Sequence, residues 1–114
     1  MDNCLFCKII SGEIKADVVY QNEDVFAFRD INPQAPVHVL IIPKKHISTT
    51  NDITPADTNL MGKLLVAARD IAEKEGIAQS GYRQVLNCNA HGGQEVFHIH
   101  LHLIGGRQMT WPPG

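Results

Sequence analysis

His98-Ile99-His100-Leu101-His102-Leu103 is a strictly alternating run of histidine and aliphatic residues near the end of the chain. Because successive side chains of a β-strand point to opposite faces, this run predicts a strand with three imidazoles on one face and its aliphatic residues in the core. Residues two apart on a strand lie about 6.6 to 7 Å apart, so the outer two histidines are separated by about 13 Å. One metal ion fits all three poorly, and we expect instead a central histidine that acts on a substrate.

The rest of the chain supplies further strands and two helices. Runs of β-branched and aromatic residues predict strands over 18–20, 25–28, 37–43, 82–88 and 97–104. Apolar spacing predicts a short helix over 4–10 and a long helix that Thr54 caps, that begins at Pro55 and that ends at Gly76. The order helix, three strands, long helix, two strands predicts an α+β domain on a five-stranded, largely antiparallel sheet.

Composition narrows the class of protein. A chain of 114 residues with 44% hydrophobic residues can bury one core, so we expect a single domain over 1–114. A net charge of -2 gives no overall positive potential to attract nucleic acid. No apolar run reaches the roughly 18 residues of a membrane span. Three cysteines, two of them spaced as Cys4-x-x-Cys7, do not form a disulfide framework. We expect a cytoplasmic protein, which could also enter the nucleus in a eukaryote.

The alternating histidines favour a chemical role over a structural one. A single histidine in a strand is usually a packed residue, but the desolvation of three imidazoles is costly without a purpose. Imidazole is substantially neutral near pH 7 and can act as nucleophile, acid or base. Gly92 and Gly93 precede the run and can turn backbone amides toward an anion, although hairpin turns also use such pairs.

At this point the chain resembles the histidine-triad (HIT) family, and within it the branch of Hint-like purine nucleoside phosphoramidases. The most specific part of the resemblance is the His-x-His-x-His run after Gly-Gly-Gln. The other segments that carry it are 6–10 (Phe-Cys-Lys-Ile-Ile), 30–36 (Asp-Ile-Asn-Pro-Gln-Ala-Pro), 43–47 (Pro-Lys-Lys-His-Ile), 105–109 (Gly-Gly-Arg-Gln-Met) and the tail 111–114 (Trp-Pro-Pro-Gly).

The resemblance implies a two-step hydrolysis of purine nucleoside 5'-phosphoramidates. His100 would displace the leaving group from the α-phosphate to give a nucleotidyl-histidine, which water then hydrolyses. His98 would orient His100, His102 would hydrogen-bond the phosphate or the leaving atom, and His38 would be a supporting fourth histidine. Asn87 and the backbone around Gly93 and Val96 would complete the phosphate cradle. Catalysis of this kind needs placed donors rather than a cofactor.

A purine nucleoside monophosphate is the ligand that the resemblance implies. Asp30 would accept hydrogen bonds from the ribose hydroxyls, and the base would lie among Phe6, Ile9, Ile10 and Ile31. Without the resemblance, Asp30 reads as a loop residue and the isoleucines read as core.

Glu95 departs from the pattern, because many relatives carry Ser or Thr there. An ionised carboxylate only accepts hydrogen bonds and would repel a phosphate. Either Glu95 points away from the phosphate or the leaving-group preference differs, and we give it no catalytic role.

Cys4-x-x-Cys7 admits a metal site and a redox dithiol. A redox pair usually follows a strand in a βαβ unit, which this sequence lacks. The resemblance implies a structural zinc ion held by Cys4, Cys7, His46 and His98. Cys88 is expected to be a packed core thiol.

The resemblance also implies a homodimer whose sheets join, with Trp111 reaching the partner's site. Two other functions stay open. One is the dinucleoside polyphosphate hydrolase branch of the same superfamily, which shares the middle histidine. The other is a nucleotide-binding adaptor with vestigial catalysis, which the four intact histidines disfavour.

Overall fold

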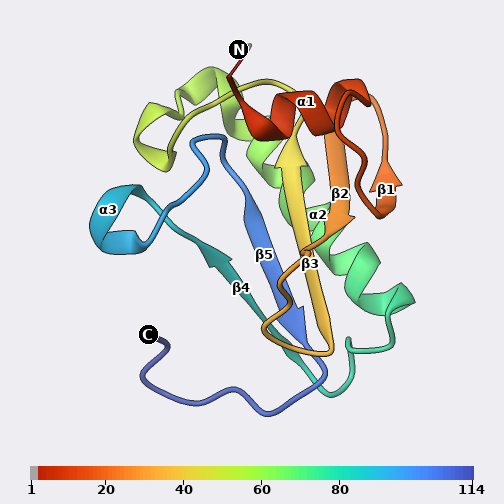
Figure 1. Cartoon of the computed structure of the whole chain (residues 1–114). Helices are drawn as coiled ribbons and strands as arrows, with labels where there is room; N and C mark the ends of the chain where they lie inside the picture. The colour runs from red at the N-terminus through yellow and green to blue at the C-terminus, as the bar shows by residue number, and fades with distance from the viewer. Residues whose placement is uncertain (1–2) are drawn as a thin grey trace.

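A computed structural model describes residues 3–114 as one antiparallel sheet with a long helix across one face (Figure 1). The elements, with η for a 3-10 turn, are α1 (Leu5–Ser11), β1 (Val18–Gln21), β2 (Val25–Arg29), β3 (Val37–Pro43), η1 (Thr50–Asp52), η2 (Pro55–Asp57), α2 (Thr58–Lys74), β4 (Tyr82–Leu86), α3 (Asn89–Gly92) and β5 (Leu101–Gly105).

The five strands lie in the order β1-β2-β3-β5-β4, and every neighbouring pair is antiparallel. This confirms the predicted five-stranded sheet. The central strand β3 has the predicted bounds, and its near-continuous apolar sequence reflects burial on both faces. Leu40 of β3 lies opposite His102 of β5, which brings the histidine strand to the middle of the sheet.

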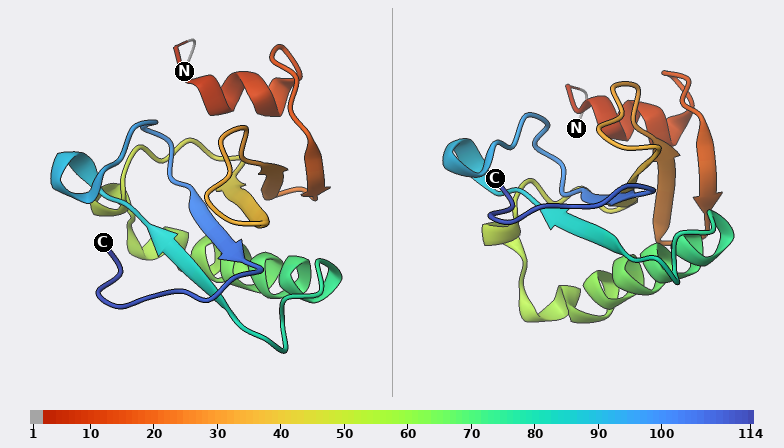
Figure 2. Two further views of the ribbon diagram at one scale, coloured as in Figure 1. Left: turned by 60° about the horizontal axis from the view of Figure 1, so that its bottom comes forward. Right: turned by 90° about the horizontal axis from the view of Figure 1, so that it is seen from below.

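Hydrophobic clusters cover both faces of the sheet. On one face, α2 packs its buried stripe, which includes Leu64 and Ile71, against residues such as Val39 and Leu103. On the other face, Phe6 and Ile9 of α1 pack against Leu40 and other aromatic and aliphatic residues of β2 and β3. Figure 2 shows α1 and α2 on opposite sides of the sheet. The alternation of β5 therefore sends Leu101 and Leu103 toward α2 and leaves His102 on the α1 side.

The long helix begins later than predicted. Thr54 caps the 3-10 turn η2 in a capping box with Asp57, and Pro55 begins that turn rather than the α-helix. The α-helix proper starts at Thr58. No helix within residues 3–114 combines the length and apolar character that a membrane crossing requires.

The two last strands are shorter than predicted. β4 ends at Leu86, and β5 begins only at Leu101. Between them the short helix α3 ends at Gly93, whose φ of 79° suits glycine. The amide of Ile99 donates to the carbonyl of Ile47 at 2.7 Å instead of to a strand partner, so the chain leaves the ladder before β5.

Candidate active site

His100 lies just before β5 with its ring almost buried, 8% exposed. Its Nδ1 lies 2.8 Å from the backbone carbonyl of His98, and a carbonyl can only accept, so Nδ1 carries the proton. The Nε2 atom of a neutral ring then has a free lone pair. The edge-to-face ring of Phe6, with centroids 5.1 Å apart, fixes the imidazole from the side. The geometry therefore gives His100 the free lone pair on Nε2 that a nucleophile needs.

His102 is held by a chain of hydrogen bonds that begins at the backbone. The amide of Gln34 donates to His38 Nδ1 at 3.0 Å, so the proton of His38 is on Nε2. His38 Nε2 lies 2.9 Å from His102 Nδ1 and donates to it. His102 therefore carries its own proton on Nε2. Since His102 lines the same cleft as His100, that proton is a fixed donor next to the nucleophile.

Burial keeps these supporting rings neutral. Desolvation, followed by the neighbouring imidazoles of His100 and His38, lowers the pKa of His102 to about 4. Desolvation also lowers the pKa of His38, against the opposing charge of Asp30 at 3.5 Å. A neutral His102 at pH 7 serves as a hydrogen-bond donor rather than as a source of protons.

The imidazole of His98 does not share the reactive surface that the alternating run predicted. The ring is fully buried and does not line the cleft, because the chain at 98 is not yet in the strand. His98 Nε2 donates to the carbonyl of Pro43 at 2.8 Å, which leaves Nδ1 as an acceptor turned toward α1. The predicted placement of the His98 ring on the reactive face was wrong. His98 contacts His100 through its backbone carbonyl, and its orienting role stays a prediction.

His98 Nδ1 belongs to a thiol-imidazole cluster formed by Cys4, Cys7, His46 and His98, whose ligand atoms all lie within 4.8 Å of one another. Nδ1 of His98 is 3.3 Å from Cys4 Sγ and 3.2 Å from His46 Nδ1, and Cys7 Sγ is 3.5 Å from His46 Nδ1. A tetrahedral zinc ion with bonds of about 2.0 to 2.3 Å has ligand atoms separated by about 3.3 to 3.8 Å. The cluster has the donor types and the spacing of a zinc site.

A cleft of about 610 Å³ opens over His100 and His102 on the α1 side of the sheet, and we call it the substrate cleft. One part of its wall combines Asp30 with the apolar side chains of Phe6, Ile9 and Ile31. Ile31 is 100% exposed, so it is not a core residue. A fully exposed isoleucine beside a carboxylate suits the face of a base and the hydroxyls of a ribose.

Another part of the wall comes from the segments on either side of α3. Asn87, Gly93 and Val96, the residues predicted to form a phosphate cradle, line the cleft there. The amide of Gly93 already donates to the carbonyl of Ala90 at 3.0 Å, so it closes the helix. Within residues 3–114 the amides of Glu95 and Val96 donate to no acceptor, which leaves them available to an anion.

Two other predicted substrate residues lie elsewhere. Ile10 packs against the apolar cluster under α1 and does not line the cleft. Trp111 is 83% exposed and does not line the cleft of its own chain. Cys88, expected in the core, is only half-buried.

Sequence reasoning missed several supporting groups. The Gln34 amide sets the tautomer of His38, and the Pro43 carbonyl sets the tautomer of His98. Both partners are backbone atoms, which no sequence pattern marks. Gln94 is buried and binds the carbonyls of Ser48 and Val96 at 2.8 and 3.1 Å, which holds the cradle loop. Its position after Gly-Gly in the sequence does not predict this role. The wall of the substrate cleft also includes Glu95.

Comparison with known proteins bears on this geometry. A model of the HIT domain matches residues 11–109. The chain is 53% identical over 108 residues to the purine nucleoside phosphoramidase of Escherichia coli strain K12, covering 95% of this chain and 91% of that protein. A HIT family hydrolase from Legionella pneumophila Philadelphia 1 shares the fold with a TM-score of 0.97 and 61% identity, covering 98% of this chain and 100% of that one. A HIT family hydrolase from Clostridium thermocellum gives a TM-score of 0.94 at 47% identity, covering 96% of each chain.

Proposed function

The chain belongs to the HIT domain family, and we propose that it hydrolyses purine nucleoside 5'-phosphoramidates through a covalent nucleotidyl-histidine. The observation that carries the proposal is the pair of fixed tautomers in the substrate cleft. His100 presents a lone pair on Nε2, and His102 presents an N–H donor beside it. The similarity to the Escherichia coli phosphoramidase supports the substrate class.

In the first step His100 Nε2 attacks phosphorus. The bond between phosphorus and the amine nitrogen breaks with its electron pair going to nitrogen, which takes a proton from solvent and leaves as the free amine. The phosphorylated imidazole is then cationic, and its Nδ1–H donates to the His98 carbonyl at 2.8 Å. That carbonyl stabilises the charge that develops on the ring.

In the second step water attacks phosphorus from the side that the amine left. The bond from phosphorus to Nε2 breaks, His100 recovers its lone pair, and the attacking water loses a proton to solvent. The nucleoside monophosphate departs with the oxygen of that water. His102 Nε2–H and the amides of Glu95 and Val96 bind the phosphate oxygens in both steps. These donors are in place before the reaction, so their reorganisation costs little.

Asp30 and the exposed Ile31 bind the nucleoside in this proposal. Asp30 Oδ1 is engaged by the amide of Asn32 at 2.8 Å, which fixes the carboxylate at the cleft wall. Its remaining lone pairs can accept hydrogen bonds from the ribose hydroxyls. Phe6 and Ile9 form the apolar floor below the base.

The test compares steady-state hydrolysis of an adenosine 5'-phosphoramidate and of a diadenosine polyphosphate. We expect rapid turnover of the phosphoramidate and a loss of several orders of magnitude in His100→Ala, with His91→Ala in the exposed turn α3 as the histidine control. Quenched reactions should contain a protein adduct with the mass of one AMP group. Faster cleavage of the polyphosphate would favour the dinucleoside polyphosphate branch, and binding of AMP with cleavage of neither substrate would favour the adaptor.

Zinc in the thiol-imidazole cluster is part of the proposal. The ion would be structural, because the four protein ligands complete a tetrahedron and leave no open position. It would tie α1 to His98, and through the His98 carbonyl to the nucleophile. Metal analysis of the purified protein should give one zinc per chain, and Cys7→Ser should lower both zinc content and thermal stability while Cys88→Ser lowers neither.

A homodimer joined through β4 is the proposed assembly. β4 is an edge strand and exposes Leu86, so a second copy can continue the sheet there. Arg83 of β4 donates to the carbonyl of Thr110 at 3.0 Å, which holds the tail with its exposed Trp111 along the same edge. Sedimentation should give the mass of two chains. A cytoplasmic location is also proposed, and three free thiols suit its reducing conditions.

A further inference from the structure

Glu95 lies on the wall of the substrate cleft with nothing to neutralise it. It is an exposed residue in the loop between α3 and β5, and it lines the cleft together with His100 and His102. Within residues 3–114 its carboxylate has no ion pair and no hydrogen bond. The cleft's other anionic side chain, Asp30, lies near His38. Two cations also line the cleft: Arg29 is bound by Glu75, and Lys15 forms no ion pair with Glu95.

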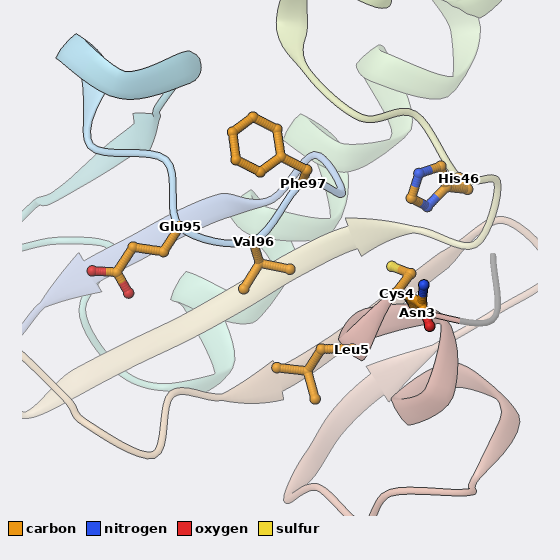
Figure 3. A pocket seen from close by; sticks show the side chains of 7 residues that line it. All are labelled: Asn3, Cys4, Leu5, His46, Glu95, Val96 and Phe97. Atoms are coloured by element: carbon orange, nitrogen blue, oxygen red, sulfur yellow. The ribbon is translucent and has the colours of Figure 1, made fainter.

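A second cavity of about 660 Å³ adjoins the substrate cleft, and we call it the side cavity. Leu5, Glu95 and Val96 line both cavities, so these three residues form their common wall. In Figure 3, Val96 of the loop lies between Leu5 of α1 and the ring of Phe97, and the carboxylate of Glu95 points away from that ring. Phe97 is 47% exposed, so its ring is available to a ligand.

The direction of the reaction places the leaving group on this side. In the proposed attack the leaving atom lies opposite His100 Nε2 across phosphorus, so the amine points away from the buried nucleophile toward the open rim. The nucleoside occupies the Asp30 and Ile31 wall, which leaves the rim near Glu95 and the side cavity for the amine.

We propose that Glu95 and the side cavity form a leaving-group subsite selective for amines whose carbon chain carries a second, cationic group. This inference rests on the proposed phosphoramidase function. The aliphatic part of such an amine lies over Leu5 and Val96, and its cationic end lies near the Glu95 carboxylate. The same carboxylate disfavours anionic leaving groups, including the phosphate chain of a dinucleoside polyphosphate.

The size of the effect follows from exposure. An ion pair between exposed groups contributes little to the binding free energy. It therefore corresponds to a preference of up to about fivefold for a cationic over a neutral leaving group of equal length. An anionic leaving group should be disfavoured by a similar factor. Screening at high salt should bring both ratios toward one, because the Debye length falls to about 3 Å at 1 M salt.

The experiment uses three adenosine 5'-phosphoramidates with leaving groups of equal length: a simple alkylamine, a diamine with a free ammonium end, and an amino acid with a free carboxylate end. The kcat/KM ratios are measured for the unaltered protein, for Glu95→Gln and for Glu73→Gln. Glu73 lies on the exposed side of α2 and controls for net charge. The expected result is a preference for the diamine that disappears in Glu95→Gln, stays in Glu73→Gln and weakens with salt.

Equal ratios in the unaltered protein and in Glu95→Gln would overturn the inference. Equilibrium binding of the same three compounds to His100→Ala, with and without Glu95→Gln, tests the subsite even if nothing is hydrolysed. A diamine preference in binding that depends on Glu95 would support the subsite while the hydrolase proposal failed. Identical affinities for the three compounds, with turnover of the alkylamine substrate intact, would refute the subsite. The proposed hydrolase function would still be supported.

Discussion

Removal of His38 should impair catalysis through His102. The bond from His38 Nε2 to His102 Nδ1 is 2.9 Å long and joins the buried ring of His38 to the half-buried ring of His102. In His38→Ala the Nδ1 atom of His102 loses its partner, and an unpaired buried group costs about 1 to 3 kcal/mol. If that cost falls on the positioning of the Nε2–H donor, kcat/KM for an adenosine 5'-phosphoramidate should fall by about 5- to 150-fold.

A double-mutant cycle isolates this coupling. In a His102→Ala background, His38→Ala should cost little, because the ring it positions is gone. His38→Gln should recover part of the activity, since its side-chain N–H can donate in place of Nε2–H. Circular dichroism and thermal melting of each variant check that the fold is retained.

Asp30→Asn is the matched control. Its Oδ2 atom is 3.5 Å from His38 Nε2, too long for a strong bond, so the variant should raise KM through the ribose and leave the coupling between the two histidines unchanged. Additive losses in the cycle, with the same cost of His38→Ala in both backgrounds, would refute the hydrogen-bond chain as the source of the effect.

Three further predictions concern stability. Because the pKa of His102 falls from 6.5 to about 4 on folding, the unfolded chain binds more protons between those values. His102 should therefore lower the free energy of unfolding by about 1.4 kcal/mol per pH unit as the pH falls from 6.5 to about 4, and an unchanged slope in His102→Asn by urea denaturation would contradict this. A methyl group on Gly105 would lie 2.6 Å from Ile77 Cδ1, so Gly105→Ala should lower stability by about 1 to 3 kcal/mol, whereas Gly62→Ala in an open helix position should raise it by about 0.5 to 1 kcal/mol; a gain at both sites would show that the strand tolerates the methyl group. Ile41 is fully buried in the central strand, and Ile41→Ala should cost about 2 to 5 kcal/mol in the same assay, with a loss below 1 kcal/mol pointing to a core that collapses around the gap.

Local patterns were enough to predict most of the fold. The apolar run 37–43 gave a central strand with the observed bounds, because burial on both faces demands an unbroken apolar sequence. Glycine and the capping residues located the helix ends to within a few residues, and the 3-10 turn at Pro55 was the main miss. The family resemblance, carried by the histidine run, supplied the residues of the cleft that composition alone would have assigned to core and loop.

By itself the sequence determined which residues can do chemistry, since the alternating run of histidines predicts imidazoles on one face of a strand, and the alternation of β5 places His102 on that face. Only the tertiary structure decided what each imidazole does. The tautomers of His98, His100 and His38 are set by a carbonyl of Pro43, a carbonyl of His98 and an amide of Gln34. Those partners are backbone atoms, which every residue possesses, so no pattern of side chains marks them. The same holds for the bend before Leu101, which turns His98 from the cleft into the cysteine cluster, because it depends on a hydrogen bond to a distant segment of the chain.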